Sequence, residues 1–273
     1  MRLESARGVI GAVALYLLFR VGAQTIAIPS VHPAILILGS VALFMLLQLA
    51  IIRAASGLQI RPKVTGWLIP VFAAAVVALI MLGAVKMPPV VAVLVASMRD
   101  IALILFAVSL GYTLSVIVRE PNILLPVAIF AAIVDYWSVN YGPLAILLAR
   151  RPQVVAAAAV QVPAMGQPEP VSMIGVGDFV FLALFFGVMY RYRMNVAGAF
   201  WLGFVLLTLT MFAVLRVPSL GAVPALVPIA IAVIGANTKH LKLKRGEVLS
   251  TLLVGIILVA LLILSVVLMS RGK

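Results

Sequence analysis

The sequence has no cysteine and only two histidines among its 273 residues. The absence of cysteine excludes disulfide bonds, thiolate metal sites and cysteine nucleophiles, although it does not indicate a redox compartment. Charged residues are also scarce, at 10% of the chain, compared with about 25% in an average soluble domain. Acids are the scarcest of them, because seven Asp and Glu accompany 20 Lys and Arg. An acid that lies inside an apolar segment of this chain therefore needs a specific reason.

The abundant feature of the sequence is its apolar side chains, which make up 65% of the residues. A soluble fold of this length could not bury so much apolar surface. We therefore predict an all-α, polytopic integral membrane protein that is surrounded by the lipid bilayer. The net charge of +13 does not indicate nucleic acid, because Lys and Arg fall in short clusters between apolar runs. Such clusters anchor helix ends to lipid headgroups.

Apolar runs long enough to cross a bilayer, which takes about 20 residues, recur along the chain. The first run is too long for a cleavable signal peptide and is expected to remain as a transmembrane helix. The fourth run is long and contains Arg99 and Asp100, so its division into two helices stays open. The runs predict about nine transmembrane helices, at residues 8–27, 34–53, 66–84, 90–118, 121–141, 174–192, 195–215, 220–236 and 247–270.

The connection between the fifth and sixth predicted helices, residues 142–173, is the longest and is rich in proline. Prolines at this density prevent a continuous helix. No stretch of the sequence resembles a soluble domain, and no internal repeat is found. We therefore expect one membrane domain.

Most of the acids have an ordinary explanation. Asp100 follows Arg99 inside the fourth run and is expected to be an interfacial or locally paired charge. Arg20, in the first run, is expected to snorkel to the membrane surface or to pair inside the helix bundle. Four acids fall in loops or at helix ends, where we expect them to be solvated: Glu4, Glu120, Glu169 and Glu247.

Asp135 and Asp178 lie inside consecutive apolar helices that the connection 142–173 joins. At about 1.5 Å per residue, they are roughly 9 Å and roughly 6 Å below the same membrane surface. Burying either carboxylate alone would cost several kcal/mol, and neither helix carries Lys or Arg in its core. We therefore expect the two acids to face each other and share a proton in a small water-filled cavity. Such a pair suits an aspartic protease, and also a proton- or cation-coupled transporter.

Asp178 belongs to Gly175-Val176-Gly177-Asp178, which opens a predicted helix, and Pro224-Ala225-Leu226 falls in a later one. A G-x-G-D aspartate, a second aspartate one helix earlier and a downstream P-A-L motif resemble the presenilin and signal peptide peptidase family of intramembrane aspartyl proteases. Phe179-Val180-Phe181 and Gly142-Pro143-Leu144 are also similar to presenilin segments. The resemblance is dense in the second half of the chain, and in the first half it rests on hydropathy.

The resemblance implies a presenilin-like fold and hydrolysis of peptide bonds within the membrane. It implies that Asp135 and Asp178 are the catalytic pair, and that transmembrane segments or signal peptides are the substrates. One carboxylate would activate water and the other would polarise the scissile carbonyl, so no metal and no cofactor are expected. The substrate-binding residues that we assign on this basis are Gly175, Gly177, Pro224, Ala225, Leu226 and Tyr136.

Within the single membrane domain, residues 1–120 are then predicted to be scaffold helices and residues 121–273 the catalytic region. The chain departs from the family at its first aspartate, since the family usually has Tyr immediately before it. Here Val134 precedes Asp135 and Tyr136 follows it. A short chain rich in Ala, Val and Leu, without soluble additions, is expected in the cell membrane of a prokaryote.

A substrate helix must unwind before its peptide bonds can be attacked, and the freed amide groups then need partners within the bilayer. A strand added beside 171–174 or beside 224–226 would supply those partners.

The glycines around Asp178 have a second interpretation, close helix packing. Three other functions stay open: a prepilin-peptidase-like G-x-G-D protease, an ion- or proton-coupled transporter that uses both aspartates, and an inactive relative that only binds membrane helices.

Overall fold

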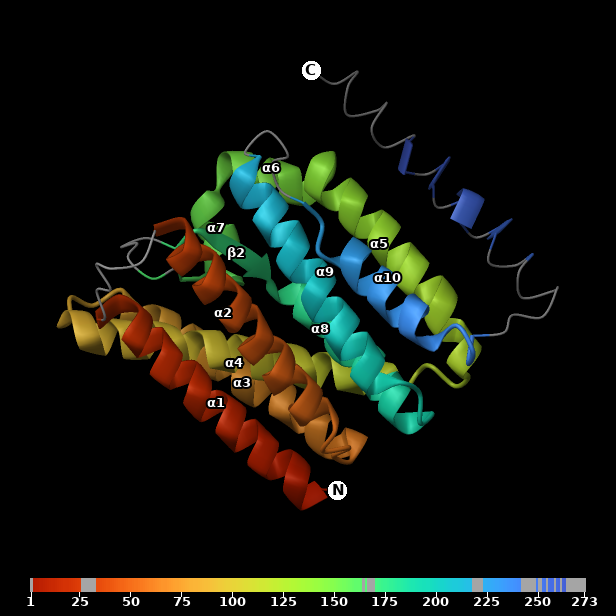
Figure 1. Ribbon diagram of the computed structural model, residues 1–273, viewed down its shortest axis with the longest axis horizontal. Coiled ribbons are helices and arrows are strands. Elements are labelled where there is room, and N and C mark those ends of the chain that lie inside the picture. Colours follow the sequence, from red (N-terminus) through yellow and green to blue (C-terminus); the bar gives the residue numbers. More distant parts are fainter. Residues whose placement is uncertain are drawn as a thin grey trace. The chain divides into compact units, whose positions relative to one another are not determined.

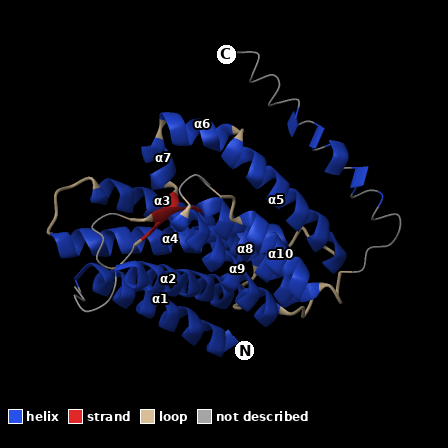
Figure 2. Cartoon of the chain, turned by 45° about the horizontal axis from the view of Figure 1, so that its top comes forward, coloured by secondary structure: helices blue, strands red, loops and turns tan. Residues whose placement is uncertain are grey.

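The structure is a computed structural model, and it is helical over most of its described length (Figure 1). It describes residues 2–25, 33–163, 165, 170–217, 223–241, 249, 252–253, 255–257, 259–260 and 262–263. The helices are α1 (Arg2–Thr25), α2 (Pro33–Ser56), α3 (Pro62–Gly83), α4 (Pro89–Ser115), η1 (Pro121–Ile123), α5 (Leu124–Asn140), α6 (Pro143–Arg150), α7 (Pro152–Ala157), α8 (Val176–Arg191), α9 (Val196–Arg216) and α10 (Leu226–Asn237). Figure 2 shows the strands, β1 (Ala159–Val162) and β2 (Ser172–Gly175), as a small hairpin among the helices.

The structure confirms the membrane-protein class. Six helical segments of the described chain are long and apolar enough to cross a bilayer: Ala6–Ala23, Ile35–Ser56, Pro62–Gly83, Pro89–Ser115, Pro121–Arg150 and Val196–Arg216. The division of the fourth run into two helices is wrong, because α4 continues through Arg99 and Asp100 over 27 residues.

The count of about nine spans stays a prediction. Two of the predicted runs form shorter helices than expected. α8 has 16 residues, because the chain before it is extended in β2. α10 has 12 residues and begins at Leu226 rather than near residue 220. The last run, 247–270, falls mostly outside the described residues.

Proline sets many of the element boundaries. Proline has a fixed φ and no N–H, so it suits the first position of a helix and disfavours the helix interior. Six of the described helices begin at a proline, namely Pro33, Pro62, Pro89, Pro121, Pro143 and Pro152. The predicted interruption over 142–173 is confirmed, because two short helices and the hairpin replace a continuous helix there.

The described chain divides into two compact units, and each is described by itself. The first consists of Met1–Ile117 and Gln153–Arg193, and the second of Val118–Pro152 and Met194–Lys273. This division is defined by contacts between residues. The division into scaffold helices (residues 1–120) and a catalytic region (residues 121–273) is defined by function, and it stays a prediction.

In the first unit, α4 packs against α1, α2, α3 and α8, and also against β1. The contact between α4 and α8 is close because small residues line it. A methyl group added at Gly111 would overlap the carbonyl oxygen of Val180, and one at Gly187 would lie 2.7 Å from Ser115 Oγ. Arg191 of α8 donates hydrogen bonds to the Ser115 carbonyl at 2.9 Å and to its Oγ at 3.1 Å. Small residues and interhelical hydrogen bonds are what hold helices together in lipid.

In the second unit, α10 packs against both α5 and α9. Asn195 caps α9, since its Oδ1 accepts a hydrogen bond from the Gly198 N–H at 2.8 Å. The fully buried Asn237, at the end of α10, accepts from the Asn195 N–H at 2.7 Å. These bonds fix the end of α10 against the start of α9.

Candidate functional site

Asp178 lies where a strand becomes a helix. β2 ends at Gly175, which has extended backbone angles and is the N-cap of α8, and Asp178 follows in the first turn of the helix. The side chain is half-buried. An acid in the first turn is favoured because the helix N-terminus carries partial positive charge.

The glycines of the motif leave space beside this carboxylate. A methyl group added at Gly175 would lie 3.5 Å from Asp178 Oδ2, which is ordinary contact distance, and one at Gly177 would meet nothing within 4 Å. Gly177 is also exposed. Within the described residues, the structure therefore gives Gly177 no close packing contact that would exclude a side chain.

The hairpin that precedes Asp178 is antiparallel, with Val160 opposite Ile174 and Gln161 opposite Met173. Its β1 side chains Val160 and Val162 are buried. The Val176 N–H, at the start of α8, donates to the Ala158 carbonyl at 3.2 Å and so extends the pairing into the turn. The position of Asp178 thus follows directly from the position of the hairpin.

Asp135 lies on α5 and is half-buried. Its Oδ2 accepts a hydrogen bond from the Leu226 N–H at 3.0 Å. Leu226 is the first residue of α10, and a helix leaves its first N–H groups without intrahelical partners. The carboxylate therefore satisfies a free backbone donor and also lies at the positive end of the helix. The structure brings the first predicted aspartate together with the P-A-L motif.

The P-A-L motif is the start of α10. Pro224 is buried ahead of the helix, Ala225 is its N-cap, and the buried Leu226 is its first residue. Pro228 lies in the first turn of α10, where a proline removes no intrahelical hydrogen bond. Pro224 does mark a boundary, since residues 223–225 are not helical.

Tyr136, the remaining predicted substrate contact, is 52% exposed. It lines an apolar groove of about 640 Å³ between α5 and α10, together with residues such as Ile133 and Val227. The groove is formed by side chains that flank Asp135 and Leu226 in the sequence. The groove offers an apolar segment a place beside Tyr136, and Asp135 is not among the residues that line it.

The pairing of Asp135 with Asp178 stays a prediction. Asp178 belongs to the first compact unit and Asp135 to the second, and the units are described separately. What the structure adds is the setting of each acid: a helix N-terminus behind Asp178, and the N-terminus of another helix against Asp135.

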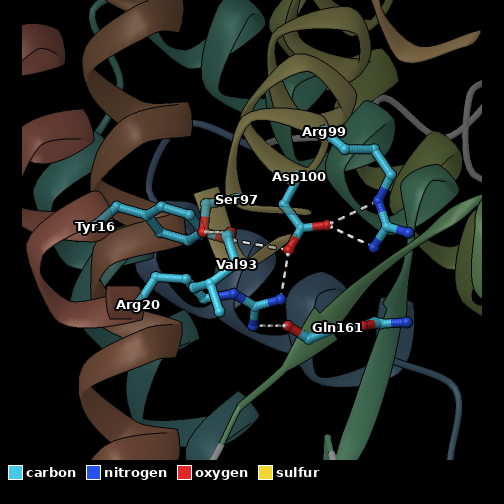
Figure 3. A network of polar contacts seen from close by, with 7 residues as sticks. All are labelled: Tyr16, Arg20, Val93, Ser97, Arg99, Asp100 and Gln161. Atoms are coloured by element: carbon cyan, nitrogen blue, oxygen red, sulfur yellow. Dashed lines mark hydrogen bonds and ion pairs between the residues drawn. The ribbon is translucent and has the colours of Figure 1, made fainter. Parts of the chain in front are cut away.

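Asp100 is the most deeply buried acid among the described residues, and sequence reasoning did not predict this burial or its pairing with Arg20. Asp100 is fully buried and lies between two guanidinium groups (Figure 3). Its Oδ2 is 3.1 Å from Arg20 Nη2, and its Oδ1 is 2.9 Å from Arg99 Nη2. The Tyr16 hydroxyl donates to the same carboxylate at 3.4 Å. The expected local pairing with Arg99 and the expected pairing of Arg20 inside the bundle are both confirmed.

A signal for this network was present in the sequence. Tyr16 and Arg20 are four residues apart in an apolar helix, so they share one face, and a face with two polar groups needs a polar partner in lipid. The described residues hold no group of three or more His, Asp or Glu that could bind a metal ion.

Comparison with protein-family models finds no match, and no curated protein and no solved structure matches the chain significantly. The presenilin resemblance therefore rests on the residues themselves: the G-x-G-D turn, the aspartate one helix earlier and the P-A-L motif.

Proposed function

We propose that this protein is an intramembrane aspartyl protease that hydrolyses peptide bonds within transmembrane segments or signal peptides. The observation that carries the proposal is the hydrogen bond from the Leu226 N–H to Asp135 Oδ2. It joins two motifs that lie 91 residues apart and that the resemblance assigns to one site. A presenilin-like fold and a location in the cell membrane of a prokaryote are parts of the same proposal.

In the proposed reaction, Asp135 and Asp178 share one proton. The ionised carboxylate takes a proton from water, and the resulting hydroxide adds to the scissile carbonyl carbon while the protonated carboxyl donates to the carbonyl oxygen. As the C–N bond breaks, the leaving amine takes the proton that the base gained from water, and the other carboxylate recovers a proton from a hydroxyl of the tetrahedral intermediate. The Leu226 N–H hydrogen bond fixes the position of the Asp135 carboxyl group. In this scheme either of the two acids can act as the base, with the other as the proton donor.

The substrate would bind in extended form. Unwinding frees its amide and carbonyl groups, and a strand edge inside the protein can pair with them. β2 leads directly into the turn that carries Asp178, so a peptide paired with β2 would pass beside that carboxylate. The apolar groove at Tyr136 would take the part of the substrate that is still helical.

The experiment that tests this function uses detergent-purified protein and a single-span membrane substrate, with fragments identified by mass spectrometry. Asp135→Asn and Asp178→Asn each preserve side-chain shape, and we expect each to lower cleavage by at least 100-fold. Glu120→Gln is the matched control, because it removes an exposed acid outside the site and is expected to leave cleavage unchanged. Cleavage that persists in both aspartate variants would refute the assignment.

A transporter is distinguished by the same preparation. Reconstituted into vesicles, a transporter would move solute without producing peptide fragments, and both asparagine variants would block that flux. A protease would instead bind hydroxyl-containing transition-state isosteres, and loss of that binding in Asp135→Asn would report the same site without turnover.

A further inference from the structure

The buried charge network of the first unit reaches the hairpin that leads into α8 and Asp178. Arg20 on α1 is 3% exposed, and its Nη2 pairs with Asp100 while its Nη1 donates to the Gln161 carbonyl of β1 at 2.9 Å. Figure 3 shows the guanidinium between the carboxylate and the strand. One side chain therefore joins α1, α4 and β1.

The acceptor on β1 lies on the open edge of the hairpin. In an antiparallel pair, the residues of every second pair direct their N–H and C=O groups away from the partner strand. The bond from the Val176 N–H to the Ala158 carbonyl fixes this alternation, and it places the Gln161 carbonyl on the side away from β2. Arg20 thus supplies the partner that this carbonyl would otherwise lack within the membrane.

The same alternation shows which backbone groups of β2 point away from β1. On β2, Met173 and Gly175 direct their backbone groups outward, away from β1. Arg20 covers the Gln161 carbonyl on β1. The β2 edge is the one that continues into Asp178, and the proposed function places the substrate strand there.

A hairpin of two short strands is only marginally stable by itself. Here three features hold Arg20 in place against it: the ion pair with Asp100, the Phe44 ring 5.8 Å from its guanidinium carbon, and burial. Asp100 is in turn held by Arg99 and by Tyr16. Asp100 therefore keeps other partners when one arginine is removed, whereas the hydrogen bond to the Gln161 carbonyl comes from Arg20.

We infer that Arg20 is a positioning residue: it anchors β1 through the Gln161 carbonyl, and so fixes the hairpin edge and the turn from which Asp178 projects. The inference concerns how the proposed protease site is held, and so rests on the proposed function, but the anchoring of the hairpin can be measured without turnover.

Arg20→Met and Arg99→Met form a matched pair. Each removes one positive charge next to Asp100 and leaves the other arginine to pair with it. Only Arg20→Met removes the donor to Gln161. If Arg20→Met does not fold, Arg20→Gln is the second variant. The glutamine amide ends two bonds short of the guanidinium nitrogens and cannot reach β1.

The first measurement is hydrogen–deuterium exchange of the full-length protein in detergent. We expect the amides of 159–162 and 172–175 to exchange at least tenfold faster in Arg20→Met than in the unmodified protein, and at an unchanged rate in Arg99→Met. Unchanged hairpin protection in the Arg20 variants, or an equal loss in Arg99→Met, would overturn the inference.

The second measurement is cleavage of the single-span substrate. We expect Arg20→Met to lower kcat at least tenfold, because it displaces Asp178, and to raise KM as well, because it loosens the β2 edge that binds peptide. Arg99→Met should retain both values. An unmodified protein that does not cleave would refute the proposed function, and the exchange experiment would still decide the role of Arg20.

Discussion

A methyl group at Gly111 is expected to push α8 away from α4. The added carbon would overlap the Val180 carbonyl oxygen and would lie 2.9 Å from both Ala183 Cβ and Leu184 N. Carbon atoms in favourable contact are about 3.5–4.0 Å apart, so the helices would have to separate by at least about 0.6 Å, which forfeits part of the dispersion energy along the contact. Two of the three obstructing atoms are backbone, so rotating a side chain cannot relieve the overlap.

The size of the effect follows from two opposing terms. Overpacking a close contact costs about 1–3 kcal/mol, and alanine gains about 0.5–1 kcal/mol over glycine inside a helix. Gly39→Ala is the matched control, because Gly39 lies in α2 and a methyl there meets nothing within 4 Å. The difference in unfolding free energy between the two variants is therefore the overpacking cost, about 1–3 kcal/mol.

The assay is thermal unfolding in detergent followed by tryptophan fluorescence, with cleavage measured on the same samples. Gly111→Ala should unfold at a lower temperature than Gly39→Ala. It should also cleave at least tenfold more slowly, because α8 carries Asp178 in its first turn and a displacement of about 1 Å can cost about 100-fold in rate. Equal unfolding temperatures would refute the close-contact reasoning, and normal cleavage in a destabilised variant would refute the link to Asp178.

Two further predictions concern the carboxylates of Asp135 and Asp100. Asp135→Ala leaves the Leu226 N–H without its acceptor and should lower the unfolding free energy by about 1–3 kcal/mol. Asp135→Asn keeps an acceptor, so its unfolding free energy should be close to that of the original protein. Equal unfolding free energies in the two variants would contradict the role of the hydrogen bond. Asp100→Ala leaves the buried Arg20 without its acid partner and should cost about 3–5 kcal/mol, measured by denaturation in detergent. Arg99→Met keeps the Arg20 ion pair and should cost clearly less, and a larger loss in Arg99→Met would contradict the assignment.

Much of the fold could be predicted because its causes are local. The apolar runs predicted the membrane class, and the six long helices confirm it. Proline predicted the interruption of 142–173, since a residue without an N–H acts on its own backbone wherever it stands. The pairing of Arg20 was predicted for a similar reason: a charge inside an apolar helix needs a partner, whatever that partner is.

The particular partners could not be predicted in the same way. Asp100 is 80 residues from Arg20 and beside Arg99, so sequence proximity indicated one partner and concealed the other. The hairpin was missed as a formed element, because its strands have four residues each and depend on burial against α4. The start of α10 was placed too early, because an apolar run does not show where its first free N–H groups find acceptors.

The sequence by itself determined the surroundings of this protein, the places where helices stop and the few acids that need an explanation. These follow from transfer free energies and backbone chemistry, which belong to single residues and short segments. Only the tertiary structure decided that Asp135 meets the Leu226 N–H and that Arg20 bridges Asp100 and β1. The physical reason is that a polar group within the membrane must find a partner from the protein, and the nearest one in space is set by helix packing rather than by distance along the chain.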